Sequence, residues 1–294
     1  MVNHGTPDGA PPADAGGAPP GPGSGQPEAD RGVPLLQLRG LEKSFGPVHA
    51  LTNVDLDVPA GQVTALVGDN GAGKTTLIKC VAGIWEPSAG RILWNGRPVH
   101  IRSPRDASAL GIATVYQDLA LCDNLDIVQN MMLGHERLSY GLLDEISMEQ
   151  TAKQTLADLA VTTVRSVRQT VGSLSGGQRQ SVAVAKAVML EARLVIMDEP
   201  TAALGVSQTE LVLTLITRLA SRGHGVMVIS HNLNDVFRVA DRIAVLYLGQ
   251  LVAQGPASEF DPQSVVEIMT TGRSSRRGNG NQAAASRGSN GLEG

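Results

Sequence analysis

A glycine-rich segment carries the clearest chemical pattern in this chain of 294 residues. It fits the pattern G-x-x-x-x-G-K-[ST] with Gly68, Asp69, Asn70, Gly71, Ala72, Gly73, Lys74 and Thr75, and Thr76 follows it. In such a loop, backbone N–H groups surround phosphates, the lysine reaches the terminal phosphates and the hydroxyl contacts Mg²⁺. Residues 63–67 predict a strand and residues 75–81 a helix, a context that a glycine-rich turn with an exposed lysine would lack. The segment therefore predicts a binding site for a nucleoside triphosphate.

Polar side chains follow three apolar strands that the sequence predicts further along the chain. They are Asp198 and Glu199 after residues 194–197, His231 after residues 226–229, and Gln117 after residues 113–116. Active sites of open α/β sheets form at the carboxyl ends of strands. Each pattern alone is weak, because two acids after a strand can lie in a solvated loop and a single histidine is more often structural. Their order along the chain favours functional roles.

The sequence Leu-Ser-Gly-Gly-Gln at residues 174–178 resembles the signature of the ATP-binding cassette (ABC) family, and the resemblance extends from about residue 36 to residue 269. It implies an ATPase that binds ATP and Mg²⁺. In the family, a glutamate polarises the attacking water and a histidine contacts the γ-phosphate and holds the water in line. The implied metal ligands are Thr75, Gln117 and Asp198, and the implied catalytic residues are Glu199, His231 and Gln117.

The resemblance also implies that each nucleotide site is shared between two cassettes. The signature of one subunit would face the γ-phosphate held by the other, through Ser175, Gly176, Gly177 and Gln178. A hydroxyl, backbone N–H groups and a helix start together suit an anion. We therefore expect a two-fold dimer that forms or closes on ATP, and pairing with a different cassette stays open.

Aromatic residues are few, and one of them occupies a position with an implied role. Phe45 stands where the family stacks an aromatic ring on adenine, although an ordinary core phenylalanine is an alternative. Trp85 and Trp94 have no motif around them, so we interpret both as packing residues.

One segment departs from the family pattern. After Pro200 and Thr201, the usual Ser-Ala-Leu-Asp is replaced by Ala-Ala-Leu-Gly at residues 202–205. The acid expected to bridge to the partner's phosphate loop is therefore absent, and Gly205 stands in its place. We expect either a change in communication between subunits, with a basal turnover that differs from other cassettes, or another residue that takes the place of the acid.

The elements that must position these residues predict an α/β fold. Residues 35–38, 53–58 and 62–67 predict strands, and Asn95-Gly96 predicts a hairpin turn, so the beginning is antiparallel. Short apolar strands then alternate with helices, which indicates a mainly parallel sheet. Strand signals disappear between residues 124 and 169, and Ser147 is the predicted N-cap of a helix there. The fold class implied is a P-loop NTPase of the ABC type, with an N-terminal antiparallel β subdomain and an inserted helical subdomain at about residues 124–190.

Composition separates this domain from its ends and excludes several classes. Residues 1–32 are rich in Gly, Pro and Ala, residues 272–294 lack hydrophobic periodicity, and both predict disordered tails around a domain at residues 33–271. No apolar run approaches the roughly 20 residues of a membrane helix, and the start lacks the pattern of a signal peptide. The net charge of −4 gives no basic stripe, so no nucleic acid partner is expected. We expect a protein in the cytoplasm, at the inner face of the membrane.

The resemblance is closest to bacterial importers of monosaccharides such as ribose, xylose and fructose. It is carried by residues 40–46, 115–125 and 200–205. It implies a second cassette, a membrane permease dimer and, indirectly, an extracytoplasmic sugar-binding protein as partners. The alternatives are a cassette for another cargo and a regulatory or remodelling ATPase that has no permease.

Overall fold

A computed structural model describes residues 32–202 and 204–273 of the chain. The two tails predicted to be disordered fall outside these residues, apart from Gly32, Gly272 and Arg273. Gly272 ends the last helix in the left-handed conformation, and its N–H donates to the carbonyl oxygen of Ile268 at 2.9 Å. The last helix therefore stops with a glycine cap at the position where the sequence predicts the domain to end.

A six-stranded sheet forms the centre of the fold. Its spatial order is β12 (Gln250–Pro256), β11 (Arg242–Tyr247), β3 (Val63–Val67), β10 (Gly225–Ile229), β9 (Leu194–Asp198) and β6 (Ile112–Val115). All neighbouring pairs are parallel except β11 and β12. Every residue of β3 and β10 is buried, as expected for strands covered on both faces. The prediction of a mainly parallel sheet is confirmed.

A second sheet is antiparallel and comes mainly from the beginning of the domain. It has the order β2 (Val48–Val58), β1 (Leu36–Phe45), β4 (Ala89–Trp94) and β5 (Arg97–Val99). Asn95 and Gly96 join β4 to β5 with φ angles of 50° and 74°. Two positive φ angles in a two-residue hairpin turn match the twist of the flanking strands, which explains the Asn-Gly pair.

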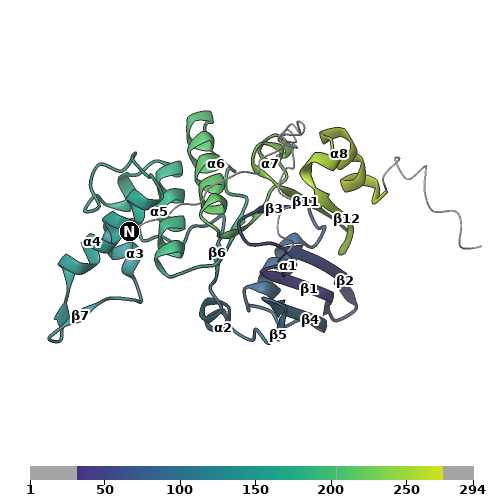
Figure 1. Ribbon diagram of the computed structural model, residues 1–294, viewed down its shortest axis with the longest axis horizontal. Helices are drawn as coiled ribbons and strands as arrows, with labels where there is room; N and C mark the ends of the chain where they lie inside the picture. Colours follow the sequence, from purple (N-terminus) through teal and green to yellow (C-terminus); the bar gives the residue numbers. More distant parts are fainter. Residues whose placement is uncertain (1–31, 203, 274–294) are drawn as a thin grey trace, which may run out of the picture. The chain divides into compact units, whose positions relative to one another are not determined.

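Helices cover both faces of the central sheet. The helices of the described residues are α1 (Lys74–Val81), α2 (Pro104–Ala109), α3 (Ile127–Met132), α4 (Glu145–Asp158), α5 (Gly176–Met189), α6 (Val206–Ser221), α7 (Leu233–Val239) and α8 (Pro262–Thr271), with short 3₁₀ turns at Val171–Ser173 and Ala257–Glu259. Of these, α3 and α4 pack against α5. One hydrophobic cluster joins α1 to both sheets, and a second joins the central sheet to α5 and α6. Figure 1 shows α1 between strands of the two sheets. In the described part of the chain, no helix is both long and apolar enough to cross a bilayer.

The buried cysteine of α1 belongs to the first of these clusters. Cys80 has no exposed surface, and burial raises the pKa of its thiol to about 11. A thiol with this pKa stays protonated near neutral pH, so Cys80 is a core residue, as the sequence suggests.

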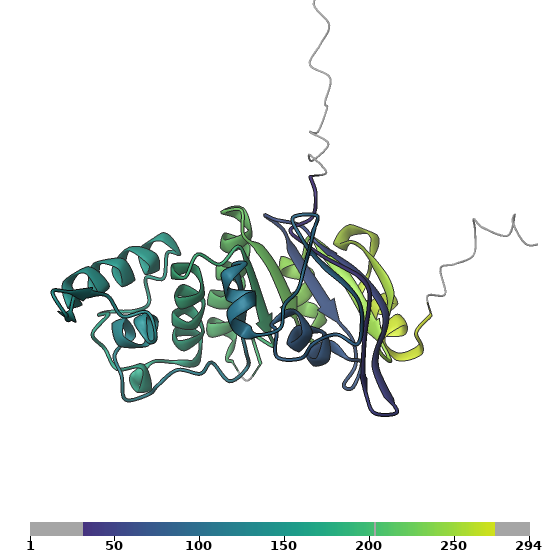
Figure 2. The same ribbon diagram turned by 90° about the horizontal axis from the view of Figure 1, so that it is seen from below.

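Helices α3, α4 and α5 pack together at a distance from the antiparallel sheet (Figures 1 and 2). The helix predicted to begin at Ser147 begins earlier, at Glu145. Its N-cap is Asp144, whose carboxylate accepts a hydrogen bond from the Ser147 N–H at 3.1 Å. The prediction of Ser147 as N-cap is therefore wrong, because an aspartate three residues earlier satisfies the same helix start.

A short hairpin, absent from the sequence prediction, precedes α4. Strands β7 (Leu138–Ser139) and β8 (Leu142–Leu143) are joined by Tyr140 and Gly141, which both have positive φ angles. The tyrosine in this turn is fully exposed. Two-residue strands carry no detectable alternation, and tyrosine is not a typical residue for positive φ, so the sequence gives little sign of this hairpin.

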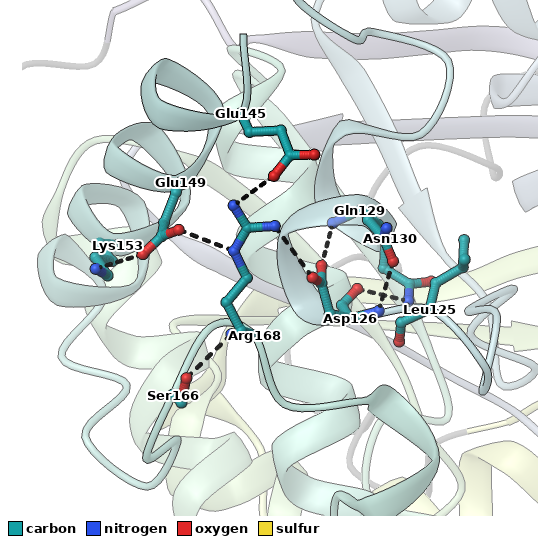
Figure 3. A network of polar contacts seen from close by, with 9 residues as sticks. All are labelled: Leu125, Asp126, Gln129, Asn130, Glu145, Glu149, Lys153, Ser166 and Arg168. Carbon is teal, nitrogen blue, oxygen red and sulfur yellow. Dashed lines mark hydrogen bonds and ion pairs between the residues drawn. The ribbon is translucent and has the colours of Figure 1, made fainter. Parts of the chain in front are cut away.

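A polar network ties these helical segments together (Figure 3). Arg168 pairs with Glu149 at 2.8 Å, with Glu145 at 3.2 Å and with Asp126 at 3.4 Å. Asp126 in turn caps α3 by accepting a hydrogen bond from the Gln129 N–H. One guanidinium therefore joins the start of α3 to the first turns of α4.

Asn130 is the buried member of the same network. Its side-chain Oδ1 accepts from the Cys122 N–H at 2.7 Å, and its Nδ2 lies within 3.2 Å of the carbonyl oxygens of Cys122, Leu125 and Asp126. A single amide thus fixes the path of residues 122–126, the segment that leads from Gln117 into α3.

We predict that Asn130→Ala lowers the free energy of unfolding by about 1–3 kcal/mol, because buried backbone groups of residues 122–126 lose their partners. Urea unfolding measures the change. The matched control is Gln154→Ala, which removes an exposed side-chain hydrogen bond to Asp158 and should change stability by less than about 0.5 kcal/mol. Equal effects of the two substitutions would contradict this role of Asn130.

Candidate functional site

A cavity of about 500 Å³ opens where the phosphate-binding loop meets the carboxyl ends of the central strands. Most of the loop lines it, from Asn70 to Thr76, together with Gln117, Asp198 and Glu199. These residues follow β3, β6 and β9, which lie in one sheet. The parallel arrangement therefore brings together residues that are separated by more than a hundred positions in the sequence.

The loop is shaped for close contact with an anion. Gly73 precedes α1 with a φ angle of 103°, and a Cβ atom there would lie 2.8 Å from the carbonyl oxygen of Ala50. No side chain caps the first N–H groups of α1. An uncapped helix start with its positive dipole end favours a phosphate, so the loop backbone fits a polyphosphate chain.

Lys74 supplies the positive charge of the cavity. Its side chain is buried, and Nζ donates hydrogen bonds to the carbonyl oxygens of Gly68 at 2.6 Å and Asp69 at 3.0 Å. Burial lowers the pKa of Lys74, while the charges of Glu199, Asp69 and Asp198 act in the opposite direction. The ammonium is therefore held in place by the loop itself and faces two acids.

Two acids stand at the end of β9 with different surroundings. Burial raises the pKa of Asp198, the charge of Glu199 raises it further, and Lys74 and Lys79 oppose the shift. A buried carboxylate next to a second acid is receptive to a cation, because the cation stabilises the charged form. Glu199 is more specifically oriented, because its Oε1 lies 2.8 Å from Nδ1 of His231.

The backbone of Glu199 is strained. Its φ angle is +49°, a region that non-glycine residues rarely occupy. Its N–H donates to the carbonyl oxygen of Ile229 on the neighbouring strand at 2.9 Å. Strand β10 therefore supports Glu199 directly, and it also leads to His231, two residues after its end.

Asp235 supports this arrangement from α7 and was missed by the sequence analysis. Its buried carboxylate accepts hydrogen bonds from the Thr201 hydroxyl at 2.7 Å and from Nδ2 of Asn232 at 3.0 Å. It thus links the segment after Glu199 to the segment after His231. The sequence offered only an acid in the first turn of a short helix, which is common for dipole reasons alone.

His49 also lines the cavity without having been predicted. It lies on β2, and its Nδ1 is 2.9 Å from the Ser44 hydroxyl. A single histidine in a strand carries no motif, so no sequence signal could have distinguished it.

Other predicted residues lie beside the cavity or away from it. Gly68 and Asp69 hold Lys74, and His231 is joined to the cavity through Glu199. Phe45 does not line it, although it pairs across the β1–β2 hairpin with Val48, which does. None of Ser175, Gly176, Gly177 and Gln178 lines it either.

The signature residues form the start of α5. The Ser175 hydroxyl accepts from the Gln178 N–H, and Gln178 Oε1 accepts from the Ser175 N–H at 2.9 Å, which is a capping box. Gly177 is buried, and a Cβ atom there would lie 3.1 Å from the Gln208 side chain of α6. The motif thus folds as a capped helix start packed on the segment that follows Glu199.

Comparison with known proteins identifies the family. A sequence model of the family described as ABC transporter matches residues 51–202, just over half of the chain. The chain belongs to the ABC transporter family. It is an ATP-binding member, of the kind that hydrolyses ATP.

Individual relatives agree with this assignment. The fructose import ATP-binding protein FrcA of Rhizobium meliloti is 43% identical over 244 residues, which cover 81% of this chain and 94% of the relative. The ribose import ATP-binding protein RbsA 2 of Rubrobacter xylanophilus is 44% identical, but this chain spans only 46% of its length. Among solved structures, MJ1267, an ATP-binding cassette of an ABC transporter, has a TM-score of 0.71 at 26% identity and matches 80% of this chain and 98% of its own.

The departure at Gly205 has a simple local structure. Gly205 is the N-cap of α6 with an extended backbone (φ −73°, ψ 164°), and no side chain caps this helix. A Cβ atom at this position would meet no other atom within 4 Å. The fold therefore accepts an aspartate there, and the missing acid has no steric cause in the described residues of this chain.

We predict that Gly205→Asp raises the free energy of unfolding by about 0.2–0.5 kcal/mol, because the aspartate side chain can cap the start of α6. We also expect the substitution to change the turnover and cooperativity of ATP hydrolysis. Gly205→Ala is the matched control, because it adds a side chain without a carboxylate. Thermal unfolding and steady-state hydrolysis measure the two effects. Identical turnover and cooperativity in all three proteins would count against any role of this position between subunits.

Proposed function

We propose that this chain is the ATP-hydrolysing subunit of an ABC importer that powers the uptake of a monosaccharide through a separate membrane permease. The observation that carries the proposal is the cavity in which Lys74, Asp198 and Glu199 meet, in a chain 43% identical to a fructose import ATP-binding protein. Residues 33–271 would form the ATP-binding domain, with the helical subdomain at about residues 124–190. The protein would lie at the inner face of the membrane.

The residues of the cavity suggest how hydrolysis proceeds. The loop backbone and Lys74 bind the phosphates and neutralise charge that develops on the γ-phosphate. Glu199 accepts a proton from the attacking water, and His231 holds the Glu199 carboxylate through the 2.8 Å contact with Nδ1. Glu199 lines the cavity together with the phosphate-binding loop, which places its carboxylate beside the bound phosphates. Phe45 stacks on the adenine ring.

The oxygen donors of the cavity fit Mg²⁺. The Thr75 hydroxyl, the Gln117 amide and the Asp198 carboxylate are hard oxygen groups, and Mg²⁺ commonly takes few protein ligands together with phosphate oxygens. Burial and the charge of Glu199 raise the pKa of the half-buried Asp198, so a cation beside these two acids would stabilise their charged forms. When bound, the ion would supply charge stabilisation to the phosphates.

A second cassette would account for the position of the signature. Ser175, Gly176, Gly177 and Gln178 do not line the cavity of their own chain, and Ser175 at the start of α5 is exposed, so this helix start would contact the cavity of a partner. The hydroxyl and N–H groups at the start of α5 suit a γ-phosphate. A two-fold dimer supplies both halves of both sites at once.

The segment from Gln117 into α3 is the expected contact with the permease. Asn130 and Asp126 hold residues 122–126 in a defined path. We therefore expect a displacement of this segment by the permease to move Gln117 at one end and the helical region at the other. The sugar, delivered by an extracytoplasmic binding protein, would not touch this chain. Another cargo, or a regulatory role without a permease, remains the alternative that the experiments below test.

For the chemistry, we predict that Glu199→Gln lowers the rate of ATP hydrolysis at least about 100-fold while ATP binding persists, because the proton acceptor is lost but the phosphate contacts remain. Wild-type turnover should rise more than linearly with protein concentration, and the variant should be dimeric with ATP in size-exclusion chromatography. Glu191→Gln is the matched control, an exposed glutamate beyond the opposite end of β9. A fully active Glu199→Gln variant would exclude the proposed role of this residue.

For the cargo, we predict that deletion of the gene abolishes growth on at least one monosaccharide and that wild-type protein, but not Lys74→Ala, restores it. Detergent extracts should yield an integral permease together with this chain. Normal uptake of every monosaccharide tested would contradict the sugar assignment. Recovery of soluble partners alone would instead support a cassette that works without a permease.

A further inference from the structure

Two aromatic rings and two ammonium groups form a row beside the nucleotide cavity. Phe45 and Trp85 are in edge-to-face contact, with ring centroids 4.8 Å apart and planes inclined by 73°. The Nζ atom of Lys43 lies 5.0 Å from the Phe45 ring, and Nζ of Lys79 lies 4.5 Å from the Trp85 ring. Edge-to-face pairs and cations over ring faces are both attractive, so each member restrains its neighbour.

Backbone contacts fix the base of this row. The N–H groups of Ile84 and Trp85 both donate to the carbonyl oxygen of Lys79, at 2.9 and 3.1 Å, which folds the chain back after α1. Lys43 Nζ donates to the carbonyl oxygen of Glu86 at 2.7 Å. The Trp85 segment is therefore bonded to α1 on one side and to the end of β1 on the other.

The two rings differ in burial. Trp85 is partly buried and packs against the hydrophobic cluster between the two sheets. Phe45 is 41% exposed at the end of β1, beside a hairpin that lines the cavity. Stacking an exposed ring on a base is more favourable if the ring is already held in the right orientation, because ordering a free side chain costs entropy. The partly buried Trp85 ring packs against the Phe45 ring and can therefore hold it.

We propose that Trp85 is a positioning residue for the nucleotide base: it holds the Phe45 ring in the orientation that stacks on adenine. The inference rests on the proposed function, in which Phe45 contacts the base, and it assigns to Trp85 a role beyond packing. Helix α1 begins in the phosphate-binding loop, and residues 82–86, which include Trp85, follow its end. This short helix therefore connects the loop that binds the phosphates to the tryptophan that supports the ring at the base.

The test compares a ligand with a base and a ligand without one. Calorimetry measures the Kd of ATP and of inorganic tripolyphosphate, both with Mg²⁺, for the wild type, Trp85→Leu and Trp85→Phe. We expect Trp85→Leu to weaken ATP binding about threefold to tenfold and to leave tripolyphosphate binding within twofold, since only the contact with the base is lost. Trp85→Phe keeps an aromatic ring and should restore most of the ATP affinity.

The controls separate this role from a loss of structure. Trp94→Phe changes the other tryptophan, which is buried next to Arg193, and should alter neither Kd. If Trp85→Leu weakens both ligands equally, or if Trp85→Phe fails to restore ATP binding, Trp85 does not position the base. Thermal unfolding of each variant shows whether it is folded, and Lys43→Met, which removes the cation beside Phe45, offers a second variant with the same expected selectivity.

A double-mutant cycle with Phe45→Ala distinguishes failure of this inference from failure of the proposed function. If Trp85 acts through Phe45, Trp85→Leu should have no further effect on ATP binding in the Phe45→Ala background. A selective loss of ATP affinity in Phe45→Ala but not in Trp85→Leu would overturn only the inference. No selective loss in Phe45→Ala would instead overturn the assignment of Phe45 to the base.

Discussion

The charge balance around Lys74 is the constraint on which the rest of the site depends. A buried ammonium is costly unless it is hydrogen-bonded and faces negative charge. The loop carbonyls of Gly68 and Asp69 supply the hydrogen bonds, and Asp198 and Glu199 supply the charge. Burial raises the pKa of Asp198, and the charge of the adjacent Glu199 raises it further. Such a cluster suits both a polyphosphate and a cation. The polyphosphate would pair with the Lys74 ammonium, and the cation would pair with the two carboxylates.

The fold meets this constraint through strand order. Strands β3, β9 and β6 each end beside the cavity, and β10 lies between β3 and β9. The residue after each strand therefore needs no long connection to reach its neighbours, and the buried strands fix its position rigidly. Strand β10 holds Glu199 in its strained conformation in two ways. The carbonyl oxygen of Ile229 accepts a hydrogen bond from the Glu199 N–H, and His231, two residues later, contacts the Glu199 carboxylate.

The sequence predicts those parts of the molecule in which local residue chemistry determines the structure. The phosphate-binding loop, the Asn95-Gly96 turn and the strand before Asp198 have strong local patterns, and the structure contains each of them. Other features depend on contacts between distant segments. Asp235 is important because the Thr201 hydroxyl donates a hydrogen bond to it, and Trp85 is important because the Phe45 ring packs against it. Neither contact leaves a pattern in the sequence around Asp235 or Trp85. The N-cap of α4 was misplaced since Asp144 and Ser147 are both good caps, and tertiary geometry selected the earlier one.

The residue proposed for hydrolysis and the contacts proposed for pairing lie close together in the sequence. In the segment of residues 199–208, Glu199 comes first, Gly205 starts α6, and Gln208 packs against Gly177 in the signature helix. Along the chain, only a few residues therefore separate Glu199, the proposed proton acceptor, from Gln208, which packs on the signature helix. Because protein interiors are close-packed, a shift of α5 against α6 cannot occur without a displacement of this segment. Thr201, bonded to the buried Asp235, limits that displacement on the side of Glu199. A partner that docks on the signature would thus act on Glu199 through the packing of α5 on α6, while the hydrogen bond between Thr201 and Asp235 restrains the segment, even though the acid usual at position 205 is missing.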